Sequence, residues 1–348
     1  AVDASLNEPY DVAVDELGNV YVADSGNNKI RKISVDTGII ETEVGTGGAG
    51  FSGDGGHALN GKLDQPMGID FDSLGNLYIA DRGNHRVRKV DSESNELGTF
   101  AGNGQNLQED GYAIEGAIGG LESVSVDRSH GVVIIAGKAP TGRRKKVRAV
   151  ILGTSRPTDL RGAGPYDGGL VIITLAGAEK GEKPQDGGMA NEVRFSTGGD
   201  LVIEPDHGGN VFIGEGSGHR LYMVSGATGY ISTIAGTGTH VYKADQDNGP
   251  AIQANLSPEG LAFYGRDSTL FVNDGGSRSF GNKRIRKIDM NSGMISTVAG
   301  TGGNGFDGDG GPAINAKFNK MRGLAVDTYG NLYIADSGNN RIRVVRKP

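Results

Sequence analysis

A single pattern of residues recurs along most of the chain and restricts the fold more than any other feature. In the clearest copies, a short apolar run ends in Asp and a Gly-Asn turn leads to a second apolar run. A polar loop then leads to a basic third run. The position of Asn19 recurs, at steps of 57, 55, 79, 59 and 62 residues, at Asn76, Gly131, Asn210, Thr269 and Asn331. The 348 residues therefore divide into six copies of about 58 residues.

Apolar and polar residues alternate with a period of two in these runs, which predicts β-strands. A fourth such run follows in five copies, at residues 38–44, 96–101, 170–176, 230–235 and 294–299. Four strands per repeat predict an all-β fold, a six-bladed β-propeller of four-stranded blades, because stacked blades bury faces that one repeat cannot bury alone. We expect a single such domain over residues 1–348.

Two copies depart from the pattern. The third carries an insertion at about residues 138–169, which contains the basic run 143–146. The sixth ends after its third strand, at Val345. Because an exposed strand edge promotes aggregation, we expect residues 1–5 to complete the sixth blade beside its last strand, if any segment does.

The repeat resembles the NHL-repeat family. The family's Asp-x-x-x-Asn/His-Arg core stands at residues 81–87 and 336–342, and with one change each at 24–30 and 215–221. The Asp-Gly-Gly linkers at 53–58 and 308–313 are close twins, which is similar to bacterial-type NHL proteins. This resemblance implies a binding scaffold, often secreted or at the cell surface.

Composition narrows the classes of partner. The net charge of −7 disfavours nucleic acid, so RNA binding stays an alternative only for the basic insertion. The chain has no cysteine, which excludes disulfides and thiolate metal sites. Its apolar runs are too short to cross a bilayer. The basic side chains of the third strands are expected to be solvated, at Arg31, Arg88, Arg286 and Arg343.

The channel mouth is the first candidate site. In such a propeller, the residue just ahead of each inner strand points into the mouth, on the face that bears the loops between second and third strands. These residues are Tyr10, Met67, Glu122, Leu201 (or Asp200), Glu259 and Arg322. Polar groups that converge on a concave mouth predict a ligand site, and solvation of a water-filled channel is the alternative. Opposite blades would place Glu122 across from Arg322.

The linker loops supply a second set of candidate binding residues. These are Phe51, Asp54, Tyr112, Phe306 and Asp309. The two Phe residues occupy equivalent places in twin loops and either form shallow pockets or staple their own loops. The two Asp residues either bind calcium or make turns. Turns are favoured because calcium needs six to eight oxygen ligands.

Two histidines share one repeat position, in the loop between second and third strands. Peptidyl-hydroxyglycine lyases, which share this kind of propeller, hold zinc with loop histidines. A catalytic zinc needs about three protein ligands, and the slot is otherwise filled by Asn28, Lys283 and Asn340. We therefore predict that His85 and His219 hold no catalytic metal.

The sequence favours a non-catalytic binding module for a glycan, peptide or partner protein, with no cofactor. The alternative is a metal-dependent lyase or lactone hydrolase at the channel mouth, with zinc or calcium. The lactone hydrolase would resemble the gluconolactonases, with a metal held by Glu122, Glu259, Asn273 and Asp274.

Overall fold

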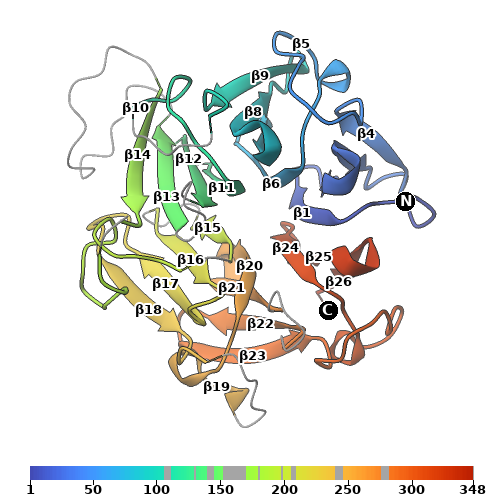
Figure 1. Cartoon of the computed structure of the whole chain (residues 1–348). Coiled ribbons are helices and arrows are strands. Elements are labelled where there is room, and N and C mark those ends of the chain that lie inside the picture. The colour runs from blue at the N-terminus through green and yellow to red at the C-terminus, as the bar shows by residue number, and fades with distance from the viewer. Residues whose placement is uncertain are drawn as a thin grey trace.

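The computed structural model describes residues 1–105, 111–128, 131–138, 145–151, 170–178, 181–196, 199–204, 209–239, 246–275 and 282–347. Over these residues the chain forms six antiparallel sheets that radiate from a central axis (Figure 1). The predicted six-bladed, all-β propeller is confirmed. No helix in the described part is long and apolar enough to cross a membrane.

Each blade runs outward from the axis in chain order. The inner strands are β1 (Pro9–Val14), β6 (Pro66–Phe71), β11 (Leu121–Asp127), β15 (Leu201–Ile203), β20 (Pro258–Tyr264) and β24 (Met321–Val326). The second strands are β2 (Val20–Asp24), β7 (Leu77–Asp81), β12 (Val132–Lys138), β16 (Val211–Glu215), β21 (Thr269–Asp274) and β25 (Leu332–Asp336). The third strands are β3 (Lys29–Ile33), β8 (Arg86–Val90), β13 (Lys145–Ile151), β17 (Arg220–Val224), β22 (Arg284–Asp289) and β26 (Arg341–Val345). The fourth strands are β4 (Ile40–Val44), β9 (Glu96–Ala101), β14 (Val171–Ala176), β18 (Ile231–Ala235) and β23 (Met294–Ala299).

The linkers between blades add short elements at the outer edge. Two-residue strands extend three of the blades outward, at β5 (Gly56–His57), β10 (Gly111–Tyr112) and β19 (Gly249–Pro250). Single turns of 3-10 helix lie in linkers and loops, at η1 (Ser25–Asn27), η2 (Ala58–Asn60), η3 (Arg82–Asn84), η5 (Ala251–Gln253), η6 (Gly265–Asp267), η7 (Ala313–Asn315) and η8 (Ser337–Asn339).

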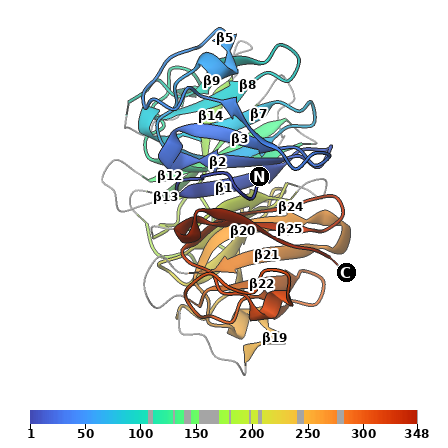
Figure 2. The same cartoon turned by 90° about the vertical axis from the view of Figure 1, so that its right-hand side faces the viewer.

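The ring closes between the first and sixth blades, where β1 and β24 lie side by side (Figure 2). The sixth blade has three strands in the described residues, and residues 1–5 do not complete it. The terminal ammonium of Ala1 instead donates to the Gly38 carbonyl, 2.8 Å away, in the first blade. The ring is closed by side-chain packing between blades rather than by a shared strand.

That packing follows from strand geometry, because successive side chains of a strand point to opposite faces. On β1, Val12 and Val14 pack toward the sixth blade against Tyr333, whereas Ala13 packs toward the second blade against Phe71. An inner strand therefore gives both its faces to neighbouring blades. Its free edge, with backbone N–H and C=O groups, lines the axis.

Candidate functional site

The predicted mouth residues form a polar layer across the channel. Tyr10, Glu122, Asp200, Glu259 and Arg322 line one small pocket at the axis. Of the two candidates ahead of β15, Asp200 lines this pocket. Leu201 does not, and lines instead a second, larger cavity that is described below. Met67 does not line the pocket. The sequence alignment of the six repeats therefore brought together five of the six mouth positions.

Arg322 organises this layer. Its guanidinium lies 3.6 Å from the Glu259 carboxylate of the neighbouring fifth blade and 5.2 Å from the centre of the Tyr10 ring. Arg322 thus forms an ion pair with Glu259 of the adjacent blade. Burial, followed by the negative charge of Glu122, raises the pKa of Tyr10, so its phenol stays protonated at neutral pH. About 10 Å³ remains free among these side chains, roughly the room that one water needs.

A much larger cavity lies on the other side of the layer, with a volume of about 500 Å³. Its wall consists of consecutive residues of the inner strands, which is expected where strand edges line the axis. Its rim carries Glu16, Ser73 and Arg128, from the turns between first and second strands. Asp11 and Asp200 line both this cavity and the small pocket. The channel is thus a funnel, open on the face opposite to the predicted mouth.

Three carboxylates in the funnel wall connect neighbouring blades. Each accepts a backbone N–H from the inner strand of the next blade, which the free strand edge would otherwise leave without a partner. The pairs are Asp11 with the N–H of Ile69 (2.9 Å), Asp70 with that of Val126 (2.8 Å) and Asp200 with that of Leu261 (3.2 Å). Sequence reasoning missed Asp11 and Asp70 as channel residues. The available signal was an acidic residue inside an apolar inner strand.

The wall carboxylates give the funnel a negative character. Burial raises the pKa of Asp11, and the neighbouring carboxylate of Asp200 raises it further. Burial also raises the pKa of Asp70, against the opposing effect of Arg128, whose guanidinium is 3.7 Å away. An ionised carboxylate is costly here because the strand edges replace much of its water.

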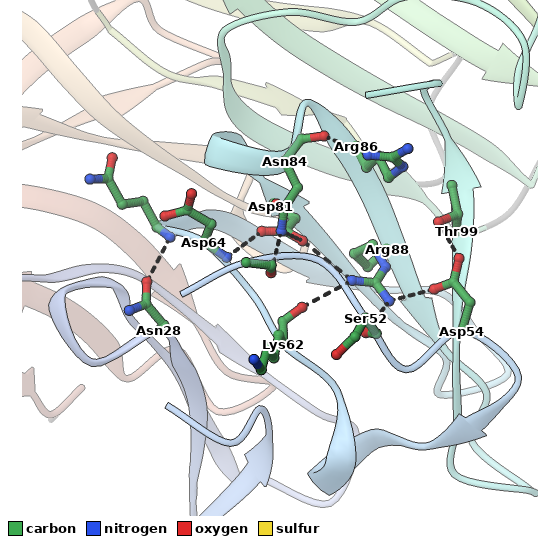
Figure 3. A network of polar contacts seen from close by, with 12 residues as sticks. Asn28, Ser52, Asp54, Lys62, Asp64, Asp81, Asn84, Arg86, Arg88 and Thr99 are labelled. Atoms are coloured by element: carbon green, nitrogen blue, oxygen red, sulfur yellow. Dashed lines mark hydrogen bonds and ion pairs between the residues drawn. The ribbon is translucent and has the colours of Figure 1, made fainter. Parts of the chain in front are cut away.

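The predicted acidic linker residue Asp54 holds its linker to the second blade (Figure 3). Arg88 on β8 is fully buried and bridges Asp81, at the end of β7 (3.4 Å), and Asp54 in the linker. It also donates to the backbone carbonyls of Ser52 and Lys62, at 3.3 Å each. Asp54 is thus engaged within the protein, and its ligand-binding role stays a prediction.

The same cluster recurs in two other blades. Arg286 joins Asp274 (3.5 Å) to Asp247 (3.0 Å), and Arg343 joins Asp336 (3.3 Å) to Asp309. The expectation that these arginines are solvated was wrong, since Arg88, Arg286 and Arg343 are 0%, 1% and 8% exposed. Arg31 keeps the pair with Asp24 (3.5 Å), and its side chain is 17% exposed.

The aromatic candidates lie on the outer linkers, away from the axis. The Phe51 ring stacks on the Arg86 guanidinium, 3.9 Å from its centre, and Phe306 stacks on Arg341 in the same way, at 4.3 Å. These contacts attach each loop to the third strand of the adjoining blade. Both rings and Tyr112 remain nearly half exposed, and their binding role stays a prediction.

The shared histidine position has a backbone explanation. His85 and His219 adopt left-handed φ angles of 51° and 57°, as do Asn28 (54°), Lys283 (45°) and Asn340 (53°). Asn and His are among the residues that tolerate this conformation best. Burial lowers the pKa of His85, with Arg82 and Arg86 contributing. In the described part of the chain, no three His, Asp or Glu side chains converge in a way that could hold a metal.

The lactone-hydrolase candidates are engaged in other contacts. The Asn273 amide donates to the Arg322 carbonyl (2.8 Å), and Asp274 pairs with Arg286. Within the predicted insertion at 138–169, residues 145–151 form β13, the third strand of the third blade. Residues 139–144 and 152–169 lie outside the described residues, and so do Arg143 and Arg144 of the basic run.

Comparisons with known proteins agree with the repeat pattern. A family model described as NHL repeat matches residues 6–33, 63–90 and 318–345. The chain is 24% identical to SUPPRESSOR OF QUENCHING 1, chloroplastic, of Arabidopsis thaliana, over 98% of this chain and 30% of that protein. It is also 24% identical to NHL repeat-containing protein 2 of Gallus gallus, over 97% of this chain and 46% of that protein.

Solved structures share the fold at low identity. An auxiliary nutrient binding protein from Bacteroides thetaiotaomicron VPI-5482 aligns with a TM-score of 0.60 and 14% identity, over 98% of this chain and 70% of that one. This likeness supports the fold alone. The chain spans between 30% and 46% of the length of the two curated relatives, so their whole-protein activities do not transfer directly.

Proposed function

Because this chain belongs to the NHL-repeat β-propellers, we propose that it is a non-catalytic binding module whose ligand enters the wide end of the central channel. The observation that carries the proposal is the funnel of about 500 Å³, which narrows to the polar layer around Arg322. Its volume lies within the range of about 300–1,000 Å³ that is usual for ligand sites.

The chemistry of the funnel wall favours binding over catalysis. Strand edges supply backbone N–H and C=O groups, which suit hydrogen bonding to a polar ligand. Raised carboxyl pKa values also occur in catalytic acids. However, Asp11, Asp70 and Asp200 each accept a backbone N–H across a blade boundary, and this structural task accounts for their burial.

The ligand class stays that of the sequence-based prediction, namely a glycan, a peptide or a partner protein. The fold-level likeness to a nutrient-binding propeller is compatible with this proposal. A secreted or cell-surface location also stays a prediction.

A screen by ligand-observed NMR, with a library of short peptides and oligosaccharides, tests the proposal. The blocking variant is Ser73→Trp, because Ser73 lies on the funnel rim. The control is Ser94→Trp, in an exposed turn outside the funnel. Ligands of the wild type should bind the control and lose affinity for the blocking variant by tenfold or more. Equal binding to both variants would refute a funnel site.

A further inference from the structure

We propose that the funnel takes a peptide segment of a partner protein, which inserts one lysine or arginine side chain and rests apolar neighbours on the rim. This inference rests on the proposed function, because it names the ligand of the same channel. It follows from two features of the funnel that occur together, namely its charge and its apolar rim.

The first feature is the charge of the funnel. Four of the side chains that line it are acidic and one is basic, namely Asp11, Asp70, Asp200 and Glu16 against Arg128. Their formal sum is −3, from four negative charges and one positive charge. Glu16 lies in the turn that follows β1, whereas the three Asp residues lie in or just before inner strands. Carboxylates are therefore present both at the mouth and along the wall. A cation that enters would stabilise their ionised form against the burial that raises the pKa of Asp11 and Asp70.

The second feature is a set of apolar tips beside the mouth. Leu17, Leu74 and Tyr329 are 80%, 77% and 76% exposed, at equivalent points of the turns that follow β1, β6 and β24. These turns belong to three consecutive blades of the ring, the sixth, first and second. Leu17 and Leu74 directly follow Glu16 and Ser73, which line the rim. Single exposed apolar residues are common, but a set beside a cavity indicates an interaction surface.

The tips are held in place by one repeated hydrogen-bond frame. An Asp carboxylate two residues before each tip accepts the tip's own N–H, at 3.0 Å for Leu17, 3.0 Å for Leu74 and 2.9 Å for Tyr329. The same carboxylates bond the Asn two residues after each tip, at Asn19, Asn76 and Asn331. The tip backbones are thus ordered before any partner arrives, which lowers the entropic cost of binding.

A basic peptide fits both features at once. A lysine or arginine side chain combines an aliphatic stem with a cationic head, so its head can reach the carboxylates while its stem passes the rim. Apolar residues beside it would cover the tips. A small amine or an inorganic cation would use the charge and leave the tips exposed, and a neutral glycan would use neither.

Two matched peptides test this inference on the full chain by isothermal titration calorimetry. They are acetyl-Gly-Leu-Lys-Leu-Gly-amide and the same peptide with norleucine in place of lysine, which keeps the stem and removes the charge. The wild type should bind the lysine peptide at least tenfold more tightly. Leu17→Ser combined with Leu74→Ser should weaken both peptides by a similar factor.

Charge variants separate the funnel from general electrostatics. Asp11→Asn still offers an oxygen to the Ile69 N–H, and Glu16→Gln lies on an exposed turn, so both should fold. Each should reduce the preference for lysine to about threefold or less. Asp36→Asn, an equal change of charge on an exposed turn outside the funnel, should leave the preference intact.

The outcomes distinguish this inference from the proposed function. Equal binding of the two peptides, or a preference that survives both Asp11→Asn and Glu16→Gln, would overturn the inference. If neither peptide binds while other ligands are excluded by Ser73→Trp, the inference fails and the proposed function stands. If Ser73→Trp excludes no ligand at all, both fail.

Discussion

Removal of the Arg88 guanidinium should destabilise the second blade more than any other single change in its third strand. In an Arg88→Met variant the aliphatic bulk remains, but the fully buried carboxylate of Asp81 loses its cation. The linker loses its ion pair through Asp54 and two hydrogen bonds to the Ser52 and Lys62 carbonyls. Breaking a buried pair from one side costs about 3–5 kcal/mol, and we expect a loss of unfolding free energy in that range.

The first blade supplies the matched control, because Arg31 pairs there with Asp24 and, among the described residues, with no linker Asp. Arg31 pairs with Asp24 at 3.5 Å, donates to the Glu41 carbonyl and is partly exposed. Water can therefore replace part of its interaction with Asp24, and Arg31→Met should lower the unfolding free energy by no more than about 2 kcal/mol.

Urea unfolding followed by circular dichroism measures both effects. At an m value of about 3 kcal/mol/M, Arg88→Met should lower the urea midpoint by about 1 M or more. Hydrogen exchange should show the extra opening concentrated at linker residues 52–62. Equal losses of unfolding free energy in Arg88→Met and Arg31→Met, or no faster hydrogen exchange in that linker, would refute the proposal that Arg88 holds the linker to the blade.

Three further predictions follow from the channel and the loops. Since burial raises the pKa of Asp11 above its value in the unfolded chain, ionisation costs stability as pH rises from about 4 through the raised pKa. The stability of wild type relative to Asp11→Asn should therefore fall from pH 4 to pH 8 in urea titrations, and a constant difference would contradict the assignment. Because His85 has a left-handed backbone, His85→Asn should leave the unfolding free energy nearly unchanged, whereas His85→Val should lower it by about 1–2 kcal/mol. Equal melting temperatures of the two variants would refute this. A Cβ at Gly323 would overlap the Asp11 carboxylate and approach the Asp11 Cα to 2.9 Å, so Gly323→Ala should lower the unfolding free energy by about 1–3 kcal/mol in urea titrations. A neutral effect would refute this close packing.

Repeat periodicity was sufficient to predict the blades. It also placed Tyr10, Glu122, Glu259 and Arg322 around one axis, because equivalent positions of a ring must converge. It did not predict which end of the channel is open. That depends on side-chain volume at the polar layer, where Arg322 folds over Tyr10 and fills the mouth.

The buried arginines were missed for a different reason. A basic residue on a strand usually indicates a solvated position, and burial becomes favourable only with its partners in place. Asp81 precedes Arg88 by seven residues, and Asp336 precedes Arg343 by the same interval, so half of the cluster was visible in the sequence. The other half, such as Asp54, comes from a linker whose path depends on the assembled ring.

A crystal structure of the protein with the tightest ligand from the NMR screen would locate the binding site. We expect ligand density in the funnel, within hydrogen-bond distance of Asp11 or Asp70. Density on the opposite face, over the layer of Tyr10 and Glu122, or on the outer loops around Phe51, would contradict it.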